Sequence, residues 1–404
     1  MAQLYGIEYL QRLLNRKRDR VLLRYRYYDM KKLVRDFGIS TPPTLRGVTS
    51  TFGWCAKAVD SLADRLILKG FKNDNFAIGE IFEQNNPDIL PTAAIQAALI
   101  GACSFIYIYP SDNGMPVMQV IDGSDATGVA DPVTGMLHEG YAVLERDRDR
   151  KVVEEAYFEP GRTTYYRAGE ADRVFLHDLK YPLLVPVINR PDATRPLGHS
   201  RISRACMSYV ESAIRTAKRS EITAEFYSFP QKWVSGLDQD AERMEKWQAT
   251  ISALLTFSKD DAGDRPTIGQ FSQASMTPHI EQLRMFASLF AGETGLTLDD
   301  IGFPSENPSS AEAIRAGHEN LRLMARRAQR DFGTGFLNAG FLAASLRDEF
   351  PYERQNLYLT KAVWEPIFEP DAGQISGIGD AILKIQQAFP DYFTEEKLEE
   401  LTGI

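Results

Sequence analysis

Residues 293–316 read ETGLTLDDIGFPSENPSSAEAIRA and join two helical patterns through a loop that contains Gly302, Pro304 and Pro308. Ser309, followed three residues later by Glu312, predicts a capping box at the start of the second helix. Beyond the box, apolar residues recur at helical spacing, namely Ile314, Leu321, Ala325, Ala328 and Phe332. The loop has clear helix signals on both sides, and the chain has no catalytic signature. This combination favours a mechanical role over catalysis.

The helix before this loop is predicted to begin at Thr277-Pro278, with the threonine as its cap and proline at the first position. Over 280–291 its residues are apolar nearly all round. A helix that is apolar on every side must be buried on every side, which favours packing between subunits. The residues expected at such a subunit interface are Leu283, Phe286, Leu289 and Phe290.

A long helix is predicted over 200–229, because apolar residues follow one stripe and Pro230 can stop it. Three basic residues lie just past its middle: Arg215, Lys218 and Arg219. A smaller mixed unit should follow, with a strand at 232–234 and a helix over 241–255. After the central loop the pattern predicts a capped helix, a strand-like run over 356–364 and a final helical pair over 375–401.

The first third of the chain reads as helices and then strands. Helices are predicted over 45–68, with Gly70 as the stop, and over 76–84. From 105 to 176 the runs VMQVI, YAVLER, KVVEEAYFE and TTYYRAG are separated by turn signals such as Asn113-Gly114. The charged run 146–151 alternates in sign and is interpreted as an exposed hairpin tip.

One uncharged segment, 92–109, has the roughly 18 residues that a membrane span needs. It divides into a small-residue helix, Gly101 as terminator and a β-type run, so we interpret it as a buried helix followed by a buried strand. The sequence therefore predicts a soluble chain with no membrane partner.

The first 36 residues carry ten basic and four acidic side chains with tyrosines between them. Such a helix could contact nucleic acid or an acidic face of another subunit, or it could be a solvated helix that packs its apolar stripe on its own domain. From Asp371 onward the balance reverses, with seven acidic and two basic residues.

The whole chain of 404 residues has a net charge of −9, which argues against tight binding of nucleic acid over a broad basic surface. Its three cysteines, Cys55, Cys103 and Cys206, are far apart in apolar contexts and predict buried free thiols. The five histidines are scattered, so neither a metal site nor a cofactor is expected.

Five separated segments, in this order, resemble the bacteriophage portal proteins, and in particular the branch similar to the SPP1 gp6 portal that is common in phages of actinobacteria. They are 27–29 with 37–39, 54–66 with 70–71, PVINRPD at 186–192, PLGHSRIS at 196–203, and ETGLTLDDIGF with ENPSSAEAIRAGHENL between 293 and 321. The resemblance implies an α+β, mainly helical portal fold with wing, stem, clip and crown regions that assembles as a ring.

The same resemblance implies a division of the chain. The regions are a wing (1–199), a first stem helix (200–229), a clip (230–271), a second stem helix (272–295), a tunnel loop (296–309), a long helix (310–348) and a C-terminal wing or crown region (349–404). The implied channel residues of the tunnel loop are Leu296, Thr297, Asp299, Asp300, Phe303, Pro304, Ser305, Glu306, Asn307 and Pro308.

The resemblance also implies the function. Proteins of this family form a ring, typically a dodecamer, at the unique vertex of the virion capsid, and double-stranded DNA passes through its channel during packaging and ejection. The implied partners are the terminase large subunit, a head-completion or adaptor protein, and the major capsid and scaffolding proteins, with assembly in the host cytoplasm. The ATPase belongs to the terminase, so this chain is expected not to be an enzyme.

Two other functions remain open. An enzyme is disfavoured because the chain has no GxxxxGK[ST] loop, no GxSxG elbow and no HExxH helix, and turn chemistry accounts for the carboxylates at Asp122 and Asp125. The alternative of a different class is another virion structural or adaptor protein without a DNA channel.

Overall fold

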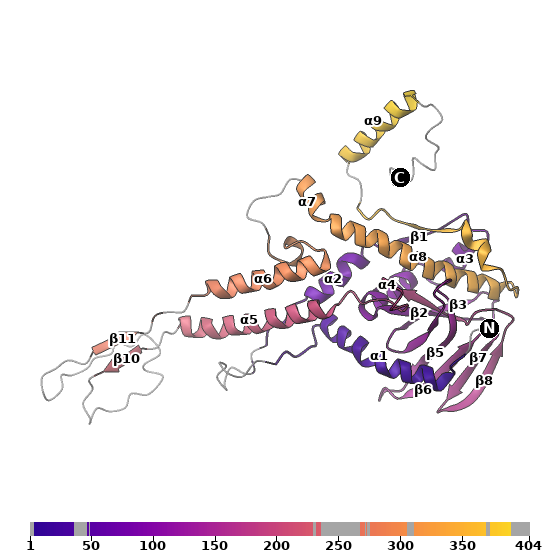
Figure 1. The fold of residues 1–404 in the computed structure, drawn as a ribbon, viewed down its shortest axis with the longest axis horizontal. Coiled ribbons are helices and arrows are strands. Elements are labelled where there is room, and N and C mark those ends of the chain that lie inside the picture. The colour runs from indigo at the N-terminus through magenta and orange to yellow at the C-terminus, as the bar shows by residue number, and fades with distance from the viewer. Residues whose placement is uncertain are drawn as a thin grey trace.

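A computed structural model describes residues 4–35, 47, 49–228, 232–235, 267–270, 272, 275–304, 311–368 and 372–388. Within these ranges helices combine with antiparallel sheets, which confirms the predicted α+β class. Two long helices project from a body that consists of α1–α4, β1–β9, α8 and β12 (Figure 1).

The described helices, in chain order, are α1 (Ile7–Tyr28), α2 (Trp54–Ala63), α3 (Ile78–Gln84), α4 (Ile89–Gly101), α5 (Arg204–Ser228), α6 (Thr277–Thr294), α7 (Ala311–Gly317), α8 (Glu319–Arg347) and α9 (Ala372–Ala388), with the 3-10 turns η2 (Asp299–Ile301) and η3 (Arg354–Tyr358). The described strands are β1 (Leu68–Lys72), β2 (Cys103–Tyr109), β3 (Val117–Asp122), β4 (Ala126–Ala130), β5 (Leu137–Arg146), β6 (Val152–Glu159), β7 (Arg162–Arg167), β8 (Glu170–Leu176), β9 (Leu184–Ile188), β10 (Lys232–Ser235), β11 (Thr267–Gln270) and β12 (Lys361–Trp364).

The centre of the body is a three-stranded antiparallel sheet in the order β3-β2-β9. The run CSFIYIY of β2 is apolar without alternation because this middle strand is buried on both faces, by α4 and by α8. The segment 92–109 is therefore a buried helix followed by a buried strand, as predicted. The helix ends at Gly101, and Ala102 makes the turn with a φ of 91°.

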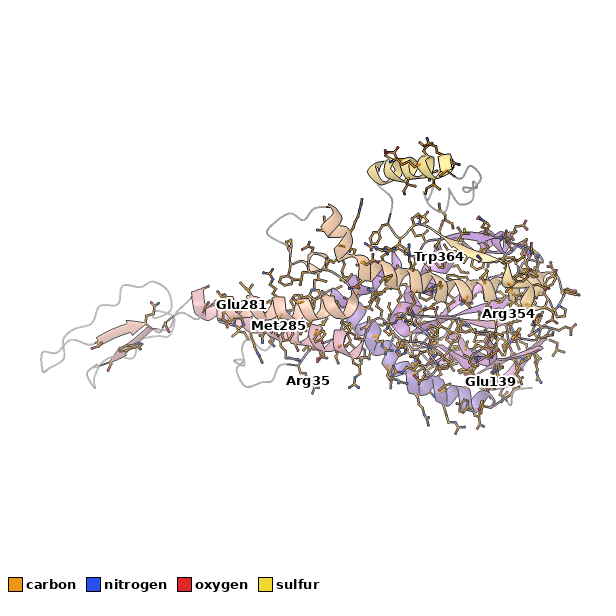
Figure 2. All side chains as sticks on the ribbon, turned by 45° about the horizontal axis from the view of Figure 1, so that its top comes forward. Arg35, Glu139, Glu281, Met285, Arg354 and Trp364 are labelled. Atoms are coloured by element: carbon orange, nitrogen blue, oxygen red, sulfur yellow. The ribbon has the colours of Figure 1, made fainter. Side chains whose placement is uncertain are left out.

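The second sheet is a five-stranded antiparallel meander, β4 to β8, against which α1 packs. Leu10 and Leu14 of α1 pack with Tyr141, Val143 and Tyr157 in a small core of their own. The start of the helix is fixed by a buried carboxylate, because Glu139 accepts hydrogen bonds from the backbone N–H groups of Tyr5 (2.9 Å) and Gly6 (3.1 Å) and from the Tyr157 hydroxyl (2.8 Å). Figure 2 labels Glu139 beside α1. Residues 147–151 of the charged run lie between β5 and β6 and are exposed, which confirms the hairpin tip, whereas Arg146 is the half-buried last residue of β5.

Helices α5 and α6 lie side by side and antiparallel, and the ribbon of β10 and β11 lies beyond their outer ends (Figure 1). Polar contacts join the pair along its length, since the Thr216 hydroxyl bonds to the Gln282 side chain at 2.9 Å and Thr223 lies 3.2 Å from the ring of His279. The long helix predicted over 200–229 is confirmed as α5, and the strand at 232–234 as β10. The helix predicted over 241–255 lies outside the described residues.

The chain then returns to the body along α8. This helix crosses α3 so closely that a Cβ placed on Gly340 would lie 2.1 Å from the Cγ2 of Ile78. Glycine is therefore required for the close approach of the two helices. After α8, the short strand β12 pairs antiparallel with β1, so residues near 70 and near 362 share one two-stranded sheet. Helix α9 stands apart from the body in Figure 1.

Three predicted boundaries are wrong. The helix predicted over 45–68 is, within the described residues, only α2, and Leu68 at the predicted end belongs to β1, which pairs with β12. Gly70, expected as its stop, lies inside that strand with a φ of 149°. Of the predicted strand-like run 356–364, residues 361–364 form β12, whereas residues 356–358 belong to the 3-10 turn η3.

The predicted start of α6 is also wrong, and the helix is only partly buried within the single chain. The helix includes Thr277, and Met276 is the capping residue without a side-chain hydrogen bond. The helix is not buried on every side of the single chain, since Ile280, Met285 and Leu289 are 59%, 48% and 45% exposed. The capping box of Ser309 and Glu312 lies outside the described residues, as does the second half of the predicted final helical pair.

The three cysteines are buried free thiols, as predicted. In the part of the chain that the structure describes, no helix is long and apolar enough to cross a membrane. The same part contains no cluster of three potential metal-ligating side chains.

Candidate functional site

The loop that follows α6 begins with a rigid turn. Gly295, with a φ of 69°, ends α6, and Asp300 then accepts hydrogen bonds at 2.8 Å from both the backbone N–H and the hydroxyl of Thr297. The Asp300 N–H in turn donates to the Thr297 hydroxyl at 3.2 Å. This reciprocal pair is a capping box around η2, which sequence reasoning did not predict on this side of the loop.

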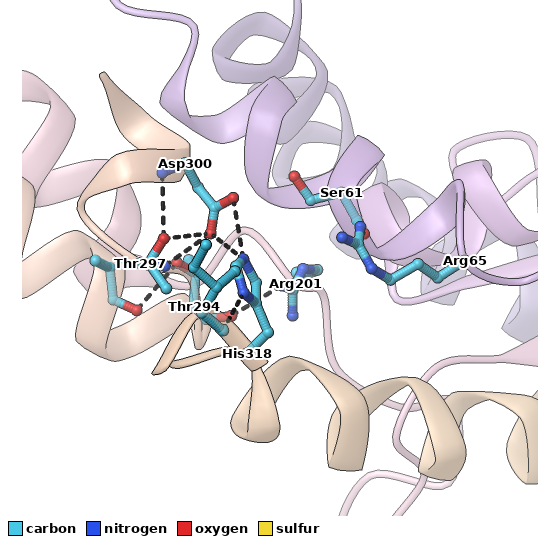
Figure 3. A network of polar contacts seen from close by, with 9 residues as sticks. Ser61, Arg65, Arg201, Thr294, Thr297, Asp300 and His318 are labelled. Carbon is cyan, nitrogen blue, oxygen red and sulfur yellow. Dashed lines mark hydrogen bonds and ion pairs between the residues drawn. The ribbon is translucent and has the colours of Figure 1, made fainter. Parts of the chain in front are cut away.

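His318 connects this turn to the joint between α7 and α8. Its Nδ1 lies 2.8 Å from the carbonyl oxygen of Ile314, and its Nε2 lies 3.2 Å from the Asp300 carboxylate. Figure 3 shows the ring between the two elements. Both nitrogens face oxygen acceptors, so the protonated imidazolium satisfies both contacts at once. The long helix predicted over 310–348 is therefore two described helices that meet at His318.

The Asp300 carboxylate is stabilised in its charged form. Burial alone would raise its pKa, but the hydrogen bonds from Thr297 and the contact with His318 outweigh burial and lower it. We call the set of Arg201, Thr294, Thr297, Asp300 and His318 the loop junction.

Replacing Asp300 with asparagine should lower the free energy of unfolding by about 1 kcal/mol at pH 7, because hydrogen bonds to a half-exposed charge are lost or weakened. A carboxyl whose folded pKa is lowered stabilises the fold above its unfolded pKa of about 3.9 and loses that contribution as the pH falls through the folded pKa. Urea unfolding of both proteins should therefore show a difference at pH 7 that narrows toward pH 3. A difference that is constant with pH would contradict this role of the carboxylate.

Arg201 is the second centre of the loop junction. Its guanidinium donates to the carbonyl oxygen of Ala58 in α2, to that of Thr294 at the end of α6 (2.8 Å) and to the sulfur of Met324 in α8 (3.5 Å). Burial lowers its pKa to about 10, so it is still charged at neutral pH. One side chain therefore fixes the end of α6 against two helices of the body.

A cavity of about 330 Å³ opens beside Arg201. Arg190 and Arg327 also line it, together with Glu293, whose carboxylate accepts a hydrogen bond from the Ser203 hydroxyl at 2.7 Å. The described lining of this cavity contains no histidine and no cysteine.

The predicted tunnel-loop residues differ in their contacts and in their exposure. Thr297 and Asp300 come together in the loop junction, Asp299 and Pro304 are exposed, and Phe303 is half-buried. Leu296 is 7% exposed and packs into the core, so it anchors the loop and does not form part of a channel wall. The other four predicted residues, Ser305, Glu306, Asn307 and Pro308, lie outside the described residues.

The predicted basic residues of the stem, Arg215, Lys218 and Arg219, lie half-buried on α5. Arg215 pairs with Glu211 at 3.6 Å and donates to the Ser212 hydroxyl at 3.1 Å. At least this guanidinium is therefore engaged within its own helix.

The four predicted interface residues of α6 differ in how far they are exposed. Phe290 has no exposed surface and packs on Trp54 of α2, with ring centroids 5.6 Å apart, so the prediction that it faces another subunit is wrong. Leu283 and Phe286 are half-buried against the same core, and Leu289 is exposed. Figure 2 labels Glu281 and Met285 on the part of α6 that projects from the body. The free apolar surface of this helix is Ile280, Met285 and Leu289.

Sequence reasoning did not single out Arg201 or His318, although both lie in the quoted segments PLGHSRIS and AGHENL. A signal was present, because each is a charged or titratable residue next to a small-residue turn at an element boundary. The partners of Arg201 lie 93 to 143 residues away, and His318 contacts Asp300 from 18 residues away, which local spacing does not reveal.

Two curated proteins are similar to this chain over most of its length. One, from Mycobacterium phage L5, is 25% identical over 330 residues, which cover 76% of this chain and 67% of the relative. The other, from Mycobacterium phage D29, is 25% identical over 343 residues, with coverages of 79% and 70%. Both relatives are named portal protein. No model of a known protein family matches the chain.

Solved structures with a similar course of the chain come from gene transfer agent particles. They are a chain of the native virion (TM-score 0.46, 13% identity), one of the native neck computed with C12 symmetry (0.49, 12%) and one of the empty neck computed with C6 symmetry (0.48, 12%). Each match covers 87% of this chain and 89–90% of the other.

Proposed function

We propose that this chain is a phage portal protein. The observation that carries the proposal is the similarity to two mycobacteriophage portal proteins across about three quarters of the chain. In this role it forms a ring, a dodecamer on the SPP1-like pattern, at the unique vertex of the capsid, after assembly in the host cytoplasm. Double-stranded DNA enters and leaves through the ring. The terminase large subunit, a head-completion protein, and the capsid and scaffolding proteins dock on it.

The geometry suits a channel that guides DNA without holding it. The paired helices α5 and α6 project as one rod, and a ring of such rods would enclose a tube. With a net charge of −9 for each subunit, the walls as a whole repel phosphate. A channel wall that binds DNA only weakly is useful here, because each phosphate that the wall neutralised would add affinity for the DNA and slow its translocation.

A ring of identical subunits also needs two different contact faces on each subunit. The exposed apolar residues of α6, Ile280, Met285 and Leu289, supply one candidate face on the stem. The loop junction has a separate role, since it fixes the start of the tunnel loop to the body. No step of this function requires catalysis by the chain itself.

The decisive experiment is electron microscopy of the purified protein, made with and without co-expressed scaffolding protein. We expect top views of a ring with a central hole. A ring without a hole, or a monomer under both conditions, would favour the alternative of a structural or adaptor protein without a DNA channel. Assays for ATPase and nuclease activity should stay at background, and sustained DNA-stimulated turnover would overturn the portal proposal.

Shortening the loop within 303–307 should leave ring assembly intact and impair DNA packaging, because this segment follows the rigid turn and is proposed to meet the DNA sterically. Packaging is measured as genome protected from nuclease in an in vitro reaction. A matched change is shortening of the exposed hairpin tip at 147–150, which should package normally. Full genomes at the normal rate with the shortened loop would contradict the tunnel assignment.

A further inference from the structure

Four arginines form a row along α1. Arg12, Arg16, Arg20 and Arg24 are spaced four residues apart, so their side chains are neighbours on one ridge of the helix. At 1.5 Å per residue, successive members are about 6 Å apart and the row spans about 18 Å. In Figure 1, α1 runs along an outer edge of the body.

The row is exposed for most of its length. Arg12, Arg16 and Arg20 are exposed, whereas Arg24 is half-buried at the inner end. Burial, and then the like charges of Arg20 and Arg195, lower the pKa of Arg24. The positive charges at this end of the row therefore repel one another.

The row lacks acidic partners within the described residues. Arg12 donates only to the backbone carbonyl of Glu8 at 3.2 Å, and no hydrogen bond or ion pair involves Arg16 or Arg20 there. The nearby carboxylates are used elsewhere, since Asp122 accepts from Tyr25 at 2.7 Å and Asp125 pairs with Arg146 at 2.6 Å. Asp19 is the one acidic residue of α1 inside the row.

On α8, by contrast, arginines form ion pairs with acidic residues of the same helix. Arg322 pairs with Glu319 and Arg327 lies 3.7 Å from the carboxylate of Asp331. Like charges four residues apart cost a helix about 0.2–0.5 kcal/mol for each pair. The row on α1 therefore carries an unfavourable charge that an anionic partner would offset.

We propose that this row binds the phosphate backbone of duplex DNA without regard to sequence, an inference that rests on the proposed portal function for its source of DNA. A protein partner is disfavoured because the centre of a protein interface is apolar, and between Arg12 and Arg24 the described helix exposes no large hydrophobic side chain. Guanidinium groups bind phosphate oxygens through paired hydrogen bonds. Binding is local and weak, in keeping with the net charge of −9.

The test measures binding of a fluorescent 20-base-pair duplex to the full-length chain by anisotropy at several salt concentrations. The slope of log affinity against log salt changes by about 0.9 for each phosphate contact. We expect the double variant Arg16→Gln, Arg20→Gln to bind more weakly and to have a slope shallower by about 2. The charge-conserving variant Arg16→Lys, Arg20→Lys should keep the original slope.

The matched control is Lys69→Gln with Arg162→Gln, which removes two exposed cations from β1 and β7 and should leave the slope unchanged. An equal change in the control, or none in the α1 variant, would overturn the proposal. So would binding of polyglutamate as tight as that of DNA at equal charge, since the row would then fit an acidic protein surface. Microscopy of the same samples separates the two proposals, because intact rings that bind no DNA would remove this inference alone.

Discussion

Replacing Arg201 with alanine should lower the free energy of unfolding by roughly 3 kcal/mol. The change removes a charged donor from two carbonyl oxygens, those of Ala58 and Thr294, and a hydrogen bond to a charged group contributes about 1.5–3 kcal/mol. The contact with Met324 is lost as well. Urea unfolding monitored by tryptophan fluorescence measures the effect, because Trp54 lies on the adjoining helix α2.

Two further variants show what Arg201 supplies. Arg204→Ala changes an exposed arginine at the start of α5 and should shift stability by less than about 0.5 kcal/mol. Arg201→Lys keeps the charge but not the planar fork, so it should lose at least half of what alanine loses. If lysine restored full stability, the charge and not the geometry would be what the site requires.

Gly198→Ala should cost about 3–4 kcal/mol, the second large effect. Gly198 has a φ of 75°, where alanine costs roughly 1–2 kcal/mol. A Cβ there would also lie 2.2 Å from the carbonyl oxygen of Asn189. Relieving that contact breaks the pair of hydrogen bonds between Asn189 and His199, at 2.8 and 2.6 Å, each worth about 1 kcal/mol.

The matched change is Gly169→Ala in the turn between β7 and β8. Its φ of 87° is similar, but no atom lies within 4 Å of the added Cβ. We therefore expect a loss of only about 1–2 kcal/mol there, from backbone strain alone. Equal losses at the two glycines, measured by thermal unfolding, would mean that the contact with Asn189 does not matter.

The elements that were predicted correctly have their signals in their own residues or in the turns beside them. The strands of the meander are separated by turn residues such as Pro160-Gly161, and the segment 92–109 divides at Gly101. The errors arise where a distant segment decides the outcome. The apolar pattern predicted a helix that continues to Leu68 and stops at Gly70, yet residues 68–72 form β1 because residues 361–364 pair with them.

The same cause limited prediction of the site. An apolar surface all round α6 shows that Phe290 is buried, but not that Trp54 of the same chain covers it. Spacing identified the loop as a connector, whereas its anchors, Arg201 and His318, depend on contacts between α2, α6, η2 and α8. Polar residues that join several elements leave no periodic pattern, so only the folded chain identifies them.

The pairing of β1 with β12 has a consequence for how the protein is made. The partner of β1 is synthesised about 290 residues later, which takes about 15–60 s at 5–20 residues per second. During that time the whole of α5, α6 and the ribbon between them is produced as an insertion into an unfinished body. Strand β1 of the nascent chain therefore has no strand partner until residues 361–364 have left the ribosome, so this part of the body can close only after α5, α6 and α8 have been made.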